Sequence, residues 1–271
     1  MCARVNIKYV DRDITDDDIL YEDNHLIAVN KRPGDIVQVD ETNDEPLDEK
    51  VKKYIAQKYN KPNGAFLGVV HRLDRPVSGV ILFAKTSKAL DRINLLFKNR
   101  EMQKTYYAVV RKRPEPPEGN LVHWLLKNPQ KNVTRAYDQM VPDGQRSELN
   151  YRLAGELEGY YLVEVNPITG RPHQIRVQLS TLGCPIVGDN KYGYPRGSLR
   201  KSICLHARRL RFIHPIKPLC QARDVLRWNA GAVITDCKYR ALLAAQPADI
   251  NARPLGRVVH RVVDQVGDST A

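Results

Sequence analysis

The sequence HRLDRPVSGVILFA, residues 71–84, decides the fold, because it joins a charged loop to an uninterrupted apolar run. An apolar run of this length beside a turn signal predicts a buried central strand. Asp74 lies between two arginines just before that strand, where charged groups are costly unless they are paired. Neighbouring cations favour the ionised form of a carboxylate, which suits a nucleophile or a base. The alternative is an aspartate that caps a turn within a local ion pair, and physical reasoning alone favours this alternative.

The segment TGRPHQIR, residues 169–176, predicts the start of a helix whose buried stripe contains Ile175, Leu179 and Leu182. The free backbone N–H groups of a helix start, together with two arginines and a histidine, suit phosphate or carboxylate binding. An ordinary basic helix start is the alternative. Arg176 directly follows Ile175, so we expect its side chain to point partly inward and to need a buried anionic partner.

The segment KTYYAVV, residues 104–110, predicts a strand. Alternation would place the side chains on two faces, with Tyr106, Ala108 and Val110 on one and Tyr107 and Val109 on the other. An aromatic ring beside Lys104 can stack on a base while the lysine meets a phosphate. A tyrosine packed in the core is the alternative.

Helices and strands mix without a regular strand–helix–strand rhythm, which favours an α+β fold over a doubly wound parallel sheet. Residues 46–59 predict a helix, and a second helix is expected from an N-cap at Ser87 to about Asn99. The other expected elements are strands at residues 26–29, 160–165 and 206–215, a turn at 31–34, and further strands and turns within 120–153.

Composition limits the class of partner. The 271 residues include 43 Lys and Arg against 31 Asp and Glu, a formal net charge of +12, which favours a polyanionic partner. The five cysteines are odd in number and form no C-x-x-C pair, which argues against a zinc site or a disulfide framework and fits reduced thiols in the cytoplasm. We find neither a signal-peptide core nor the apolar run of about 18 residues that a membrane helix needs.

Together, these segments resemble the RluA family of pseudouridine synthases. The likeness covers about residues 20–218 in the family's order, and H-R-L-D with G-R-x-H-Q-I-R and G-D-x-x-Y-G is a specific combination. The stretches that carry it are YEDNHLIAVNKRPG (21–34), HRLDRPVSGVILFAKT (71–86), KTYYAVV (104–110), TGRPHQIRVQLSTLGCPIVGDNKYG (169–193) and LHARRLRFIHP (205–215).

The resemblance implies a mixed, bent and mainly antiparallel central sheet with flanking helices and a positive cleft. It assigns the catalytic aspartate to Asp74, the base-contacting tyrosine to Tyr106 and the arginine that pairs with the aspartate to Arg176. Arg72 resembles the residue that fills the space left by a displaced base. No cofactor and no metal are expected. The expected substrate-binding residues are Arg72, His71, Lys104, Arg171, His173 and Gln174.

The implied activity is the isomerisation of uridine to pseudouridine in structured ribosomal or transfer RNA. The mechanism would depend on an aspartate, and the target nucleotide would flip out of its stack. A non-catalytic RNA-binding or RNA-folding protein on the same scaffold is the alternative. We expect a monomer in the cytoplasm, with no obligatory protein partner and no membrane association.

For domain organisation, we expect an N-terminal arm at residues 1–19, the catalytic domain at 20–240 and an extension of uncertain structure at 241–271. Because only about twenty residues precede the catalytic fold, the S4-type RNA-binding domain of many relatives is expected to be absent. RNA capture would then rely on the basic surface of the catalytic domain. The sequence departs from the family at Val77, where threonine is common, and at residues 31–34, where KRPG replaces the more usual K-P-x-G.

Overall fold

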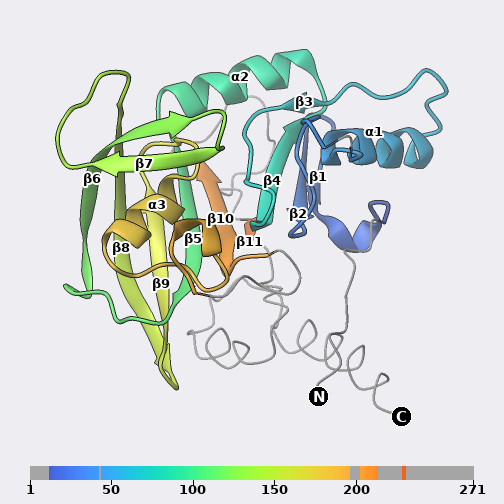
Figure 1. Cartoon of the computed structure of the whole chain (residues 1–271). Helices are drawn as coiled ribbons and strands as arrows, with labels where there is room; N and C mark the ends of the chain where they lie inside the picture. Colours follow the sequence, from blue (N-terminus) through green and yellow to red (C-terminus); the bar gives the residue numbers. More distant parts are fainter. Residues whose placement is uncertain (1–11, 43, 196–201, 213–227, 230–271) are drawn as a thin grey trace, which may run out of the picture.

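The computed structural model describes residues 12–42, 44–195, 202–212 and 228–229, and its centre is an eleven-stranded sheet (Figure 1). The main strand order is β1-β2-β4-β10-β5-β9-β8-β6-β7, with β3 beside β4 and β11 beside β10. Among the described strands, all pairs are antiparallel except the parallel pair β4–β10. The expected α+β fold with a mixed, mainly antiparallel sheet is thus confirmed. The strands are β1 (Ile19–Glu22), β2 (Leu26–Lys31), β3 (Gly68–Val69), β4 (Ser78–Ala84), β5 (Met102–Val110), β6 (Glu118–Asn128), β7 (Val133–Tyr137), β8 (Gln145–Leu157), β9 (Tyr160–Pro167), β10 (Leu205–Phe212) and β11 (Trp228–Asn229).

Within the described ranges, three α-helices flank the sheet. They are α1 (Leu47–Lys58), α2 (Ser87–Lys98) and α3 (Gln174–Thr181), and two short 3-10 helices are η1 (Asp16–Asp18) and η2 (Asn190–Tyr192). Helix α2 packs beside β3 and β4, whereas α3 lies against β6 and β7 in the other half of the sheet (Figure 1). The expected N-cap at Ser87 is wrong by one residue. The cap is Thr86, because its extended backbone lets its hydroxyl accept the N–H of Ala89 at 3.2 Å.

The burial of side chains confirms two of the strands expected from the sequence, β4 and β5. Every residue of β4 is buried, as expected of a central strand. Strand β5 alternates as predicted, because its two sets of side chains join different hydrophobic clusters. Tyr106, Ala108 and Val110 belong to the main cluster, whereas Tyr107 and Val109 pack with Leu162 and Val187. Both faces of this part of the sheet are therefore covered.

The glycine that ends the charged motif allows the two central strands to meet. Gly79 has φ +116°, and a Cβ atom there would lie 2.3 Å from the carbonyl oxygen of Ala207 in β10. A larger residue would therefore separate β4 from β10. Beside this contact, the hydroxyl of Ser78 lies 2.8 Å from Nδ1 of His206, and both side chains are buried. The loop that carries Asp74 thus enters the sheet at a rigid central junction.

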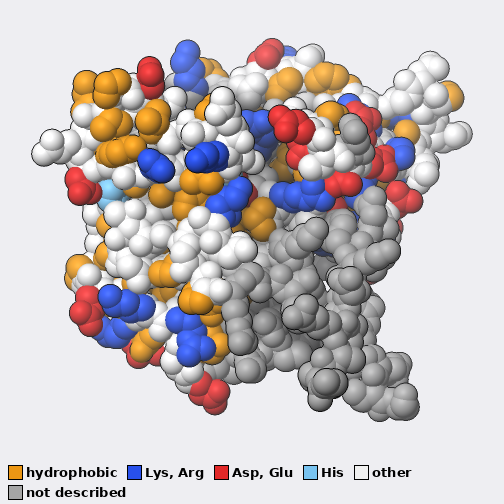
Figure 2. Space-filling view, viewed as in Figure 1, with side chains coloured by type: hydrophobic (Ala, Val, Ile, Leu, Met, Phe, Trp, Pro, Cys, Tyr) orange, Lys and Arg blue, Asp and Glu red, His pale blue; other side chains and the backbone are white. Residues whose placement is uncertain are grey.

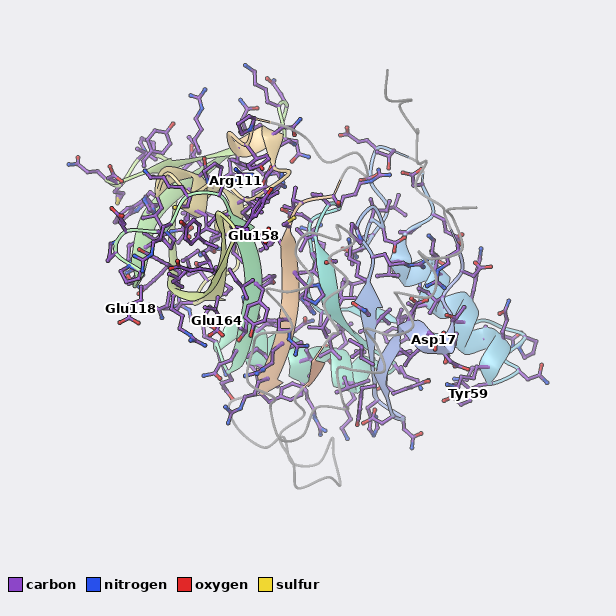
Figure 3. All side chains as sticks on the ribbon, turned by 90° about the horizontal axis from the view of Figure 1, so that it is seen from below. Asp17, Tyr59, Arg111, Glu118, Glu158 and Glu164 are labelled. Atoms are coloured by element: carbon purple, nitrogen blue, oxygen red, sulfur yellow. The ribbon has the colours of Figure 1, made fainter. Side chains whose placement is uncertain are left out.

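The two ends of the sheet are far apart. Seen from below, Asp17 and Tyr59 lie at the end that carries α1, and Glu118 and Glu164 lie towards the other (Figure 3). The chain packs against the domain before residue 20, because Ile14 is 7% exposed within the main core cluster. Residues 213–215 of the expected last strand and the expected extension at 241–271 lie outside the described residues. No helix in the described ranges is long and apolar enough to cross a membrane.

Candidate active site

The loop that carries Asp74 is held by the turn after β2. Lys31 is 1% exposed, and its ammonium donates hydrogen bonds to the carbonyl oxygens of Arg75 at 3.1 Å and Val77 at 2.7 Å. Gly34, with φ +101°, donates its N–H to the same Arg75 oxygen at 2.8 Å. Burial lowers the pKa of Lys31 to about 7. The KRPG turn therefore fixes the backbone on the C-terminal side of Asp74.

Arg176 lies between two carboxylates. Its Nε and Nη2 donate to the two oxygens of Asp189 at 2.7 and 2.9 Å, and its Nη1 donates to Oδ2 of Asp74 at 3.0 Å. The exposed fractions of the side chains are 6% for Arg176, 1% for Asp189 and 26% for Asp74. Burial lowers the pKa of Arg176, but the hydrogen bonds and charges of Asp189 and Asp74 outweigh burial and raise it. The expectation of an inward arginine with a buried anionic partner is confirmed.

A second chain of contacts reaches Asp74 through aromatic rings. The backbone N–H of Thr134 donates to the hydroxyl of Tyr192 at 2.9 Å, and this hydroxyl lies 2.7 Å from Nδ1 of His173. Nε2 of His173 lies 3.8 Å from Oδ2 of Asp74. The Tyr192 ring also lies 5.0 Å beneath the guanidinium of Arg176, at cation–π distance. The N-cap of α3, His173, and the third residue of that helix, Arg176, thus supply the two side chains that face Asp74.

Tyr106 lies in the middle of β5, between Ala207 of β10 and Val165 of β9. Burial and the negative charge of Asp74 both raise the pKa of Tyr106, so its phenol is neutral at physiological pH. Lys104, two residues earlier on the same strand, reaches the TGR turn. Its Nζ lies 3.3 Å from the point that a Cβ of Gly170 would occupy, and burial lowers the pKa of Lys104.

The structure gives Gln174 partners within the protein. Its Oε1 accepts the hydroxyl of Thr169 at 2.8 Å and the N–H of Arg171 at 3.0 Å, and its Nε2 donates to the carbonyl of Glu148 at 3.0 Å. The side chain is 4% exposed. Gln174 therefore fixes the turn before α3, and we infer a structural role where the sequence suggested substrate binding.

The His71 side chain contacts β4 and α2. Its Nε2 accepts the N–H of Leu82 at 3.0 Å, and its ring packs 5.2 Å from that of Phe97. Burial, helped by the charge of Lys104, lowers the pKa of His71 to about 3. The sequence suggested substrate binding for His71 because it lies close to Asp74 in the chain, but these contacts support a structural role.

The half-buried His71 predicts a stability change in mild acid. Its folded-state pKa lies below the unfolded value of about 6.5, so protons bind the unfolded chain preferentially between about pH 3 and 6.5. We expect the free energy of unfolding to fall by roughly 1–2 kcal/mol from pH 6.5 to 5 through this residue. Urea denaturation at several pH values measures it. His71→Gln keeps an acceptor for Leu82 and should show a smaller pH slope, and an unchanged slope would contradict this assignment.

The two other predicted arginines lie at the surface. Arg72 and Arg171 are exposed, and neither side chain has a hydrogen-bond or ion-pair partner among the described residues. The structure therefore brings together Asp74, His173 and Arg176, places Tyr106 within electrostatic reach of Asp74, and leaves two cations free for an anionic ligand. In the described part of the chain, no group of three or more His, Cys, Asp or Glu side chains is arranged to hold a metal ion.

The roles of Lys31, Tyr192 and Asp189 were not predicted from the sequence. The G-D-x-x-Y-G motif was visible, but its spacing gave no physical reason to join Asp189 to Arg176 or Tyr192 to His173. The one available signal was the expectation that Arg176 needs a buried anion. Asp189, 13 residues later, is the acidic residue that meets this need.

Comparisons with known proteins identify the family of this chain. A family model described as RNA pseudouridylate synthase matches residues 25–181. The tRNA pseudouridine synthase C of Vibrio cholerae is 32% identical over 216 residues, which cover 73% of this chain and 86% of that protein. The ribosomal large subunit pseudouridine synthase C of Rickettsia felis is 35% identical over 181 residues, covering 66% of this chain and 57% of that protein. The chain therefore spans well under two thirds of this ribosomal relative.

A solved structure shares the fold. The human RNA pseudouridylate synthase domain containing 4 superposes with a TM-score of 0.62 at 25% identity, and the match covers 72% of this chain and 83% of that one. The family-model match includes Asp74, Tyr106 and Arg176 but ends before Asp189 and Tyr192.

Proposed function

Because the chain belongs to the RluA family of RNA pseudouridine synthases, we propose that it isomerises uridine to pseudouridine in structured transfer or ribosomal RNA, with Asp74 as the catalytic residue. The observation that carries the proposal is the Asp74 carboxylate, which is partly exposed while its partner Arg176 is buried. A fixed anion at the surface can meet a substrate, and its charge is held in place by the fold.

The proposed mechanism follows the chemistry of an isomerisation. The target nucleotide flips out of its stack at a cost of a few kcal/mol. Asp74 then attacks C1′ of the sugar or removes the C2′ proton, and the bond between C1′ and N1 breaks. The freed uracil turns and C5 bonds to C1′. In the first route the bond between Asp74 and C1′ breaks in this step, and in the second Asp74 returns the proton to C2′. The C5 proton is then lost while N1 gains one. No redox change occurs, so the reaction consumes no oxidant or reductant.

We propose that Tyr106 packs against the freed uracil ring. Its place in β5 on the same face as Lys104 supports contact with the flipped nucleoside. Since burial and Asp74 raise the pKa of Tyr106, its hydroxyl acts as a neutral donor and acceptor and not as a phenolate. Lys104, Arg72 and Arg171 would meet phosphates, because their cationic groups have no acidic partner among the described residues.

Release of tritium from C5 tests the activity and separates it from the non-catalytic alternative. Transcripts of tRNA and of large-subunit rRNA, labelled with tritium at C5 of uridine, would be incubated with the full chain. We expect tritium release, because isomerisation replaces the C5 proton by the bond to C1′. RNA binding without release would instead support an RNA-binding or RNA-folding protein.

A hollow beside Tyr192 is a candidate path for the RNA strand. It has a volume of about 470 Å³, and its lining includes Arg135, Tyr137, Lys191 and Tyr192. Lysine and arginine side chains also gather around β7 and α3 on this face, next to hydrophobic ones (Figure 2). Tyr192 contacts His173 on one side and lines the hollow on the other, so the hollow adjoins the Asp74 cluster. Cations beside aromatic rings suit an RNA backbone with splayed bases.

Replacing Arg135 and Lys191 together by alanine should weaken RNA binding by about tenfold at low salt. If each contacts one phosphate, the slope of log K against log salt should become shallower by about 1.5. Filter binding at several salt concentrations measures both. The matched control replaces the exposed Lys88 and Lys98 of α2 by alanine and should leave the slope unchanged. If the two double variants had equal slopes of log K against log salt, the hollow would not be part of the RNA-binding path.

We also propose a monomer that acts in the cytoplasm without an obligatory protein partner. The cytoplasmic location is supported by the two described cysteines, Cys184 and Cys204, because neither forms a disulfide within the described residues. Size-exclusion chromatography with light scattering checks the oligomeric state.

A further inference from the structure

His173 has a backbone conformation that residues with a side chain rarely adopt. Its φ and ψ are 56° and 18°, the left-handed region, immediately before α3. Such conformations persist in non-glycine residues where the surroundings fix them, often at functional sites. Here the conformation brings the His173 ring between Tyr192 and Asp74, with 9% of its side chain exposed.

The hydrogen bonds of Tyr192 define which nitrogen of His173 carries a proton. The backbone N–H of Thr134 can only donate, and it donates to the Tyr192 hydroxyl at 2.9 Å. Nδ1 of His173 lies 2.7 Å from the same oxygen. The hydroxyl of Thr134 also contacts this oxygen, but its own proton goes to the carbonyl of Pro172 at 3.1 Å, and an imidazole nitrogen is a stronger acceptor than a hydroxyl oxygen. The proton of the phenol is therefore directed at Nδ1. The imidazole is then neutral and carries its own proton on Nε2.

Nε2 of His173 faces the same carboxylate oxygen that Arg176 holds. It lies 3.8 Å from Oδ2 of Asp74, and Nη1 of Arg176 lies 3.0 Å from that atom. A closer approach by about 1 Å would form an N–H···O hydrogen bond. Oδ1 of Asp74, in contrast, has no hydrogen-bond partner within the described ranges. The two partners thus leave one oxygen of the carboxylate free.

We propose that His173 is a positioning residue, held by Tyr192 as the neutral Nε2–H tautomer, that fixes Oδ2 of Asp74 and leaves Oδ1 to meet the nucleoside. This inference rests on the function proposed for the same site. A neutral donor steadies the carboxylate without placing a second full positive charge beside Arg176. A second charge would stabilise the anion further and make it a weaker nucleophile or base.

The charges around the ring support its neutral state. Burial lowers the pKa of His173, and the positive charges of Arg176, Lys191 and Lys127 act in the same direction. Asp74 raises it, but does not reverse the shift. Tyr192 faces the ring as a neutral phenol, because burial raises the pKa of Tyr192.

Nitrogen NMR of the full chain with ¹⁵N-labelled histidine tests the tautomer. His173 is assigned from the resonances that disappear in His173→Gln. At neutral pH we expect an unprotonated Nδ1 and a protonated Nε2, and in Tyr192→Phe we expect both tautomers to be present. A protonated Nδ1 in the unsubstituted protein would overturn the proposal. This measurement needs no turnover, so it remains decisive even if the chain releases no tritium.

Kinetics of two substitutions at His173 test the positioning role. The amide nitrogen of glutamine replaces Nε2 as a neutral donor, whereas leucine does not. We expect His173→Leu to lower kcat about tenfold with KM within about twofold, the effect of one lost hydrogen bond. His173→Gln should recover kcat to within about threefold of the unsubstituted enzyme. Equal losses in both variants, with circular dichroism showing folded proteins, would overturn the proposal, as would full activity of His173→Leu.

Discussion

Asp74→Asn is expected to lower single-turnover tritium release by at least about 10⁴-fold, because the amide is neither a nucleophile nor a base. RNA affinity should stay within about twofold, since the cations assigned to phosphate contacts are unchanged. Quenched time courses with C5-tritiated transcripts and filter binding measure the two quantities.

The fold should tolerate this substitution. Arg176 keeps both hydrogen bonds to Asp189, so its buried charge is still paired after Asp74 becomes neutral. Asp74 itself is 26% exposed, which lets an amide there remain hydrated. We therefore expect the loss of turnover without unfolding, and thermal denaturation would check that both proteins melt alike.

A matched control separates the loss of this carboxylate from a general change of charge. Asp91 lies on an exposed face of α2, and Asp91→Asn changes the net charge equally. It should keep full activity. If Asp74→Asn retained activity comparable to Asp91→Asn, the assignment of Asp74 as the catalytic residue would be wrong.

The strands around the site could be predicted because their sequence patterns report burial directly. The apolar run that follows Gly79 predicts a central strand, and every residue of β4 is buried in the structure. The alternation of β5 divides its side chains between two clusters as expected. The order of strands in the sheet was not predictable, because pairing between β4 and β10 depends on contacts that are 128 residues apart, such as Ser78 with His206.

The site was predicted less completely than the fold, because side-chain direction depends on distant groups. His71 lies three residues from Asp74 in the sequence, yet its Nε2 is occupied by a backbone N–H of β4. Lys31 is a basic residue in a turn, and its buried contacts with the Asp74 loop come from residues 44 and 46 positions away. Such contacts follow from sheet topology and are invisible in local patterns.

Asp189→Asn is expected to lower the free energy of unfolding by about 3 kcal/mol, since it removes one partner of a buried ion pair. The guanidinium of Arg176 would keep a hydrogen bond to one side-chain oxygen at position 189. The negative charge buried beside the guanidinium would be lost. Urea denaturation at pH 7 measures the change. Asp138→Asn is the matched control, because the Asp138 side chain is 90% exposed, and it should stay within about 0.5 kcal/mol of the unsubstituted protein.

The same substitution should also lower kcat, because Arg176 would no longer be fixed and its full charge would bear on Asp74. We expect a loss of at least about tenfold in tritium release. The double variant Arg176→Met with Asp189→Leu separates this effect from stability. Replacing a buried ion pair by apolar side chains is often close to neutral, so the double variant should be more stable than Asp189→Asn and still turn over poorly. If Asp189→Asn changed neither the free energy of unfolding nor kcat, Asp189 would have no part in holding Asp74 in place.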